Sequence, residues 1–97
     1  MTGGDGKAHK VAAVAADAGW YVYIVRCIDQ SLYTGIARDV GQRIALHNSG
    51  AGAAYTRTRR PVTLVHQEPA ADRGTALRRE AAIKRLPASA KRVLAGG

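Results

Sequence analysis

The feature that most restricts the fold is a pair of short runs rich in β-branched and aromatic residues. They cover residues 20–27 (Trp-Tyr-Val-Tyr-Ile-Val-Arg-Cys) and 32–36 (Leu-Tyr-Thr-Gly-Ile), and both compositions favour strands. Asp29, Gln30 and Ser31 lie between them and are typical of a turn. The pattern predicts a β-hairpin, so the fold has to be built on an antiparallel pair of strands.

Helix and strand signals follow the hairpin. Asp39 can cap a helix that runs to about residue 48, and Gly50 can end this helix in a left-handed conformation. The result is an α/β fold of the α+β type. Three further elements complete the predicted order ββαβαα: a strand over 61–66, a helix from Asp72 or Thr75 to a stop at Pro87, and a short helix over 88–95.

The length allows one domain, which we place at residues 20–95, because the 97 residues approach the ~100 of a typical small domain. Residues 1–19 are rich in Gly and Ala and contain no Trp, Tyr, Ile or Leu, which is typical of a flexible tail. No apolar run approaches the ~18 residues of a membrane span. The single cysteine, Cys27, excludes an internal disulfide, so we expect a cytoplasmic protein.

The balance of charge favours a polyanionic partner. Fifteen Lys and Arg residues against seven Asp and Glu give a net charge of +8, and from Arg57 onward there are ten against three. Long-range attraction of this sign favours nucleic acid first and an anionic membrane surface second. We expect nucleic acid, with DNA as the substrate class, and no membrane partner. Nothing in the sequence indicates the oligomeric state.

Strand alternation gathers tyrosines on one face of the hairpin, since Tyr21 and Tyr23 are two residues apart. A connection of three or five residues would place Tyr23 opposite Gly35, which leaves open space beside the ring. The same register sets Tyr33 opposite Val25, whereas an even-length connection would separate the tyrosines. Because tyrosines also favour strands for packing alone, this face is either a site or ordinary core.

The inward stripe of the first helix is half polar. A guanidinium that faces a sheet needs a partner, so this pattern indicates either a structural pair or a cleft that receives an anion. Alternatively, both polar side chains reach solvent at the edge of the stripe. The four members of the stripe are Val40, Arg43, Ile44 and His47.

Glu80 is a lone carboxylate on the second helix. It is either a salt-bridge partner for Arg43 or Lys84, or the protein ligand of a hard cation such as Mg²⁺. The other acids do not cluster, which argues against a two-metal carboxylate site. The helical neighbours of Glu80 are mostly apolar: Ala76, Leu77, Ile83 and Lys84.

A further group combines cations for phosphates with one aromatic ring that could stack on a base. Such contacts give affinity without choice of sequence. The alternative is a solvated run of charge. The members are Tyr55, Arg57, Arg59, Arg60, Lys84 and Arg85.

Tyrosines, an arginine, a histidine and one carboxylate suit phosphodiester hydrolysis. A metal ion and a guanidinium neutralise charge on the phosphoryl oxygens, and a base takes a proton from the attacking water. An ordinary tyrosine, with a pKa of about 10, is a poor base at neutral pH. Neighbouring cations would favour its phenolate.

The order of these residues resembles the GIY-YIG nuclease domain, and most closely its small single-domain UPF0213 members. Residues 21–23 (Tyr-Val-Tyr) are followed after nine residues by 33–35 (Tyr-Thr-Gly), and then by Arg43, His47 and Glu80. Further matching segments include Arg-Ile-Ala-Leu-His-Asn-Ser-Gly, Tyr-Thr-Arg, Arg-Pro-Val-Thr-Leu-Val and Ala-Leu-Arg-Arg-Glu. The first tripeptide lacks the glycine and isoleucine of the family name.

The resemblance implies a small three-stranded antiparallel sheet flanked by helices, and one Mg²⁺ or Mn²⁺ ion held by Glu80. It also implies Tyr23 or Tyr33 as the base that activates water, Arg43 as the group that steadies the phosphate, and His47 in an assisting role. Larger nucleases of this type carry an asparagine in the terminal segment, whereas the only asparagine here is Asn48.

Our first hypothesis is therefore a metal-dependent endonuclease that hydrolyses DNA phosphodiester bonds. The alternative is a nucleic-acid-binding module of the same fold with little or no cleavage. A third class, a basic adaptor for another protein, needs no active site.

Overall fold

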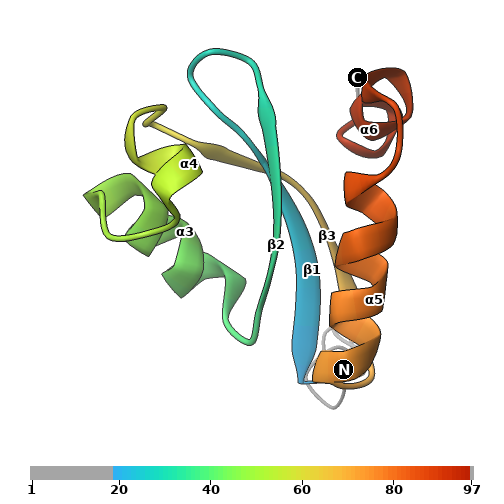
Figure 1. Cartoon of the computed structure of the whole chain (residues 1–97). Coiled ribbons are helices and arrows are strands. Elements are labelled where there is room, and N and C mark those ends of the chain that lie inside the picture. Colours follow the sequence, from blue (N-terminus) through green and yellow to red (C-terminus); the bar gives the residue numbers. More distant parts are fainter. Residues whose placement is uncertain (1–18, 97) are drawn as a thin grey trace, which may run out of the picture.

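The computed structural model describes residues 19–96, so the tail expected at 1–19 lies, apart from Gly19, outside the described residues. A three-stranded sheet lies between two layers of helices (Figure 1), which confirms the α+β class. Within residues 19–96, no helix is both long and apolar enough to cross a membrane. The elements are β1 (Trp20–Arg26), β2 (Leu32–Ala37), α3 (Val40–Ser49), α4 (Ala54–Arg57), β3 (Thr63–Ala70), α5 (Arg73–Lys84) and α6 (Ala88–Leu94).

The sheet has the order β2-β1-β3, and both pairings are antiparallel. Residues 27–31 form the five-residue connection between β1 and β2. Tyr23 pairs with Gly35, and Val25 pairs with Tyr33, so the register expected for an odd-length connection is confirmed. The tyrosines consequently share one face, and β2 is an edge strand.

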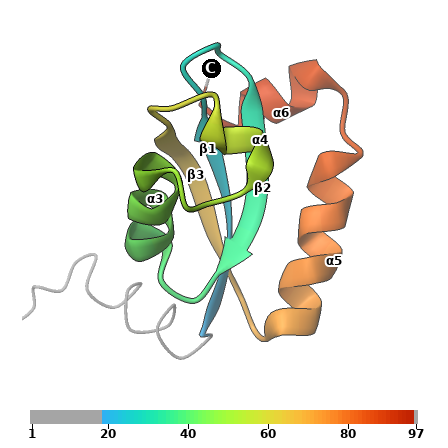
Figure 2. The same ribbon diagram turned by 60° about the vertical axis from the view of Figure 1, so that its left-hand side comes forward.

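Each face of the sheet packs on its own layer of helices. The first face carries Tyr23 and Val25, which pack with Val40 of α3. The second face carries Val22 and Ile24, and it is covered by α5, with α6 beside it (Figure 2). This division follows from the two-residue alternation of β1, whose central side chains are all buried.

The helix signals in the sequence are confirmed at their starts. Oδ1 of Asp39 accepts a hydrogen bond from the amide of Gln42 at 3.0 Å, and Gly50 ends α3 with a φ of +91°. Asp72, rather than Thr75, caps α5, because its Oδ1 accepts from the amide of Thr75 at 2.7 Å. These caps fix where the side chains of α3 and α5 meet the sheet.

Three expectations from the sequence are wrong. The short helix α4 makes the order ββααβαα rather than ββαβαα. The third strand continues to Ala70 instead of ending at residue 66, so Glu68 lies within the strand. Leu77, expected in the apolar stripe of α5, is 37% exposed, because the buried stripe runs through Ala76 and Ile83.

Glu68 joins β3 to α5. It accepts a hydrogen bond from Nε of Arg79 at 2.6 Å and lies 2.7 Å from Nε2 of His66. Burial alone would raise the pKa of Glu68, but hydrogen bonds from Arg79 and His66, together with their charges, lower it below 4.5, the ordinary value. The carboxylate form therefore stabilises the folded chain.

The substitution Glu68→Gln should lower the free energy of unfolding at pH 7 by about 1 kcal/mol. Because the folded-state pKa is lowered, this contribution is present above the unfolded pKa and is lost as pH falls through the folded value. Urea unfolding at a series of pH values measures it. A difference between wild type and variant that stays constant down to strongly acidic pH would contradict this assignment.

Candidate active site

Tyr23 reaches across the sheet because its partner on β2 has no side chain. A Cβ atom added to Gly35 would lie 2.6 Å from the hydroxyl oxygen of Tyr23 and 2.7 Å from Cζ. The ring therefore lies over the backbone of the edge strand, and only 1% of Tyr23 is exposed. The space beside Tyr23 that the sequence indicated is filled by this ring rather than left open.

The hydroxyl of Tyr23 meets His47, which α3 presents to the same face. Nε2 of His47 lies 2.8 Å from the hydroxyl oxygen, and Nδ1 lies 2.7 Å from Oγ1 of Thr56 on α4. His47 is buried, and a Cβ atom at Gly52 would overlap its Nδ1. Both ring nitrogens of His47 therefore have a fixed partner.

A cavity of about 320 Å³ opens at this point. Arg43 faces it from the partly buried side of α3, as the helical stripe predicted, and its Nη1 donates to the carbonyl oxygen of Ile36 at 3.2 Å. This anchor leaves other donors of the guanidinium available to a ligand. The lining residues are Tyr23, Tyr33, Arg43, Leu46, His47, Ala51, Gly52 and Ala53.

Burial favours the neutral forms of Tyr23 and His47 at rest. Burial raises the pKa of Tyr23 to about 12, with the charge of Tyr33 adding to it and the charge and hydrogen bond of Arg43 opposing it. Burial, aided by the positive charge of Arg43, lowers the pKa of His47. Arg43 favours the phenolate of Tyr23, as expected of a neighbouring cation, but desolvation outweighs this single cation. At neutral pH the pair consists of a phenol and a neutral imidazole.

Tyr33 lies beside this pair and is supported from α4. Its ring meets that of His47 edge-on, with centroids 5.5 Å apart, and stacks on Tyr55 at 5.9 Å. The guanidinium carbon of Arg59 lies 3.9 Å from the centroid of the Tyr55 ring, and Nε of Arg59 donates to Asp29. Tyr55 and Arg59, predicted to contact nucleic acid, are thus engaged in supporting Tyr33.

Glu80 approaches from the other layer of helices. Its Oε2 lies 3.3 Å from Nζ of Lys84, which in turn lies 5.8 Å from the centroid of the Tyr33 ring. The negative charge of Glu80 is near enough to contribute to the raised pKa of Tyr23. Of the two salt-bridge partners considered for Glu80, the structure contains the one with Lys84.

Glu80 fits a cation that keeps most of its water. In the part of the chain that the structure describes, no three His, Cys, Asp or Glu side chains form a group that could hold a metal ion. A closed, all-protein site is therefore not built here. Mg²⁺, in contrast, is commonly bound through one or two carboxylates and the phosphates of a substrate. Glu80 supplies a single carboxylate of this kind, although it is not among the residues that line the cavity.

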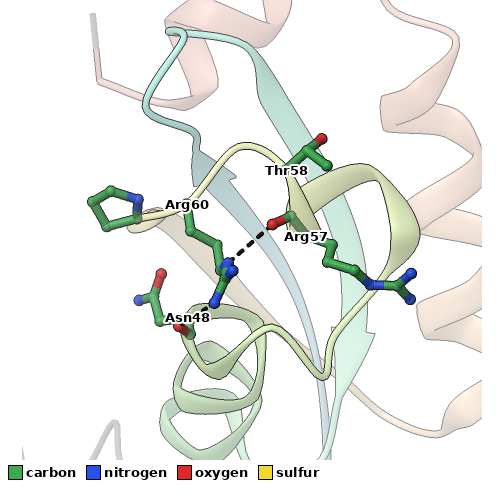
Figure 3. Close-up of a pocket in the computed structure, with 5 residues that line it drawn as sticks. Asn48, Arg57, Thr58 and Arg60 are labelled. Atoms are coloured by element: carbon green, nitrogen blue, oxygen red, sulfur yellow. Dashed lines mark hydrogen bonds between the residues drawn. The ribbon is translucent and has the colours of Figure 1, made fainter.

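The other predicted nucleic-acid residues are divided between scaffold and surface. Arg60 donates from Nε to the carbonyl oxygen of Arg57 at 2.9 Å and from Nη1 to that of Asn48 at 3.3 Å (Figure 3). It therefore ties the ends of α3 and α4 together. The side chain of Arg57 points away from Arg60 in Figure 3, and Arg57 and Arg85 are exposed. Arg57 and Arg60 border an open depression of about 590 Å³, which is also lined by Asn48, Thr58 and Pro61.

Asn48 has a structural position. Its Oδ1 accepts from the amide of Val62 at 2.7 Å, and its Nδ2 donates to the carbonyl oxygen of the same residue at 3.1 Å. This paired contact fastens the start of β3 to the end of α3. Asn48 therefore does not lie among the residues that face Tyr23.

No pattern in the sequence indicates a role for Thr56 or Gly52 in the site. Both touch His47, yet Thr56 sits inside the Tyr-Thr-Arg segment, where only its neighbours were singled out. A threonine in a short helix has no periodic pattern to mark it as buried. The one available signal was the Gly- and Ala-rich segment before it, since small residues permit close approach of the backbone to a side chain.

Gly35→Ala should lower the free energy of unfolding by about 1–3 kcal/mol, because the added methyl group overlaps the Tyr23 ring. Gly41→Ala is the matched control: its Cβ would meet only Oδ1 of Asp39, at 3.7 Å, on an exposed part of α3. We expect the control to be neutral or slightly stabilising. Urea unfolding compares the two, and equal stabilities would show that Tyr23 does not occupy this space.

Known proteins with similar sequences and structures identify the family of this chain. Residues 19–92 match the model of the GIY-YIG catalytic domain. A UPF0213 protein from Desulfotalea psychrophila is 55% identical over 77% of this chain and 69% of its own length. Another, from Cupriavidus necator, is 44% identical over 81% of this chain and 86% of its own. The solution structure of a UPF0213 protein from Bacillus halodurans is 43% identical, with a TM-score of 0.51 over 79% of this chain and 82% of that one.

Proposed function

The chain belongs to the GIY-YIG catalytic-domain family, and from that premise we propose that it is a divalent-metal-dependent endonuclease that hydrolyses phosphodiester bonds in DNA. The observation that carries the proposal is the 2.8 Å hydrogen bond between Tyr23 and His47 at the wall of a cavity that Arg43 also faces. A buried phenol that donates to a neutral imidazole can pass a proton onward. A guanidinium beside it can hold a phosphate.

Tyr23 and His47 would remove the proton of the attacking water together. As the water oxygen bonds to phosphorus, the bond from phosphorus to the leaving oxygen breaks, and that oxygen takes a proton from solvent. The proton of the attacking water moves to the oxygen of Tyr23, and the proton of Tyr23 moves to Nε2 of His47. The phenol is then restored, and the charge resides on an imidazolium. This transfer does not require a resting phenolate, which agrees with the pKa of about 12 for Tyr23. Of the two tyrosines, Tyr23 is favoured as the base because it has the proton acceptor.

Arg43 would bind the phosphate directly, and Glu80 would act on it through a bound cation. Arg43 is held through one nitrogen by the carbonyl oxygen of Ile36, so its remaining donors can bind the phosphoryl oxygens. Glu80 would hold Mg²⁺ or Mn²⁺, and the bound cation supplies Lewis-acid stabilisation of the negative charge on the phosphate. The carboxylate would have to leave Lys84 for this, which frees a cation close to Tyr33.

Binding of DNA would rest on cations that are exposed at the surface. Arg57 and Arg85 are exposed, and Lys84 is half-exposed beside the site. Contacts of this kind bind phosphates regardless of sequence and weaken as salt rises. Arg59 and Arg60 would contribute less, because their guanidinium groups are engaged within the protein.

Glu80→Gln should reduce metal-dependent cleavage by about a hundredfold or more, while salt-dependent DNA affinity changes little. The assay uses single-stranded, duplex, nicked and branched DNA, each with and without Mg²⁺ or Mn²⁺. Glu68→Gln is the matched control, since it makes the same change in a carboxylate that pairs with Arg79 instead.

Wild type that binds DNA but cleaves none of these substrates with either ion would overturn the nuclease proposal. It would favour the nucleic-acid-binding module instead. The absence of any salt-dependent affinity would exclude both and leave the basic adaptor.

A further inference from the structure

His47 has a second partner, which the proton transfer described above does not include. Thr56 is fully buried on α4, and its Oγ1 lies 2.7 Å from Nδ1 of His47 and 3.0 Å from the carbonyl oxygen of Ala53. A threonine hydroxyl has one proton to donate and two lone pairs that accept. Which of its neighbours receives that proton decides which nitrogen of His47 carries a hydrogen.

The tautomer of His47 follows from the protonation state of Tyr23. Its phenol is protonated and buried, so its proton needs an acceptor. Arg43, whose positive charge acts on this hydroxyl, can only donate. Within residues 19–96, Nε2 of His47 is the acceptor found at hydrogen-bond distance. Nε2 must therefore present a lone pair, and neutral His47 carries its hydrogen on Nδ1.

The hydrogen on Nδ1 then fixes the role of Thr56. Nδ1 faces Oγ1 at 2.7 Å, so Oγ1 accepts from it and sends its own proton to the carbonyl oxygen of Ala53. With this direction every proton in the chain of hydrogen bonds has an acceptor. With the reverse direction, Nε2 would donate to Tyr23, and the buried phenol proton would have no acceptor among the side chains and carbonyl groups of residues 19–96.

We propose that Thr56 is a positioning residue that holds His47 in the Nδ1–H tautomer and keeps the lone pair of Nε2 aimed at the hydroxyl of Tyr23. The part of this inference that concerns cleavage rests on the proposed function. The part that concerns the tautomer does not. Gly52 supports the same arrangement, because any side chain there would displace the ring from Thr56. The short helix α4 thus supplies an acceptor that sets the direction of proton transfer.

The tautomer of His47 can be measured directly by ¹⁵N NMR on the wild-type chain near pH 7. We expect the signature of a protonated Nδ1 and an unprotonated Nε2. The opposite signature, with hydrogen on Nε2, would overturn the proposal whether or not the protein cleaves DNA.

Three variants separate this role from packing. Thr56→Val keeps the volume but removes the acceptor, so the Nδ1–H signature should diminish and kcat should fall about tenfold to a hundredfold, with KM little changed. Thr56→Ser keeps the hydroxyl and should restore both signature and kcat. Thr58→Val makes the same change at the exposed end of α4 and should alter neither.

The outcomes are distinguishable. A Thr56→Val variant that keeps the wild-type tautomer, or a Thr56→Ser variant that loses it, would contradict the positioning role. If Thr56→Val does not fold, wild type and Thr56→Ser still decide the matter through the spectrum. If wild type shows the expected tautomer but never cleaves, the proposed function fails and the positioning role stands.

Discussion

The buried hydrogen bond between Tyr23 and His47 is the interaction on which the site depends. A phenol and an imidazole lose their contacts with water on burial, and that loss is offset only where each polar atom meets a partner. His47 has a second ring nitrogen that also needs a hydrogen-bond partner, and Thr56 is that partner. Thr56 in turn is held in place by the short helix α4. Burial keeps both groups neutral at rest, and in the proposed reaction they would form a proton path rather than a fixed charge.

Two glycines and an edge strand make this arrangement possible. Gly35 lets the ring of Tyr23 cross β2, and Gly52 lets His47 lie against the loop before α4. Because β2 has no strand beyond it, Glu80 of the opposite helical layer can influence the tyrosine electrostatically. The basic residues fall into two groups, those engaged within the protein and those exposed to solvent. Arg59 and Arg60 secure α4 and its surroundings, so only part of the net charge is available to a polyanion.

The sequence predicted those features that have a period or a cap. Alternation in β1 put Tyr21 and Tyr23 on one face, and it placed Tyr23 opposite Gly35 on the condition of an odd-length connection, which the structure contains. Asp39 fixed the start of the helix that presents His47. The short α4, the buried position of Thr56 and the engaged state of Arg59 could not be predicted. They depend on contacts between segments distant in sequence and leave no local pattern. The raised pKa of Tyr23 could not be predicted for the same reason, since burial is a property of the folded chain.

In the proposed reaction, the Tyr23 hydroxyl carries the proton of the attacking water. Its most direct test compares Tyr23→Phe with Tyr21→Phe, a change on the same face of β1, in cleavage and in DNA binding on one substrate. We expect Tyr23→Phe to lose metal-dependent cleavage while binding persists, and Tyr21→Phe to retain both. Cleavage by Tyr23→Phe at the wild-type rate would contradict it.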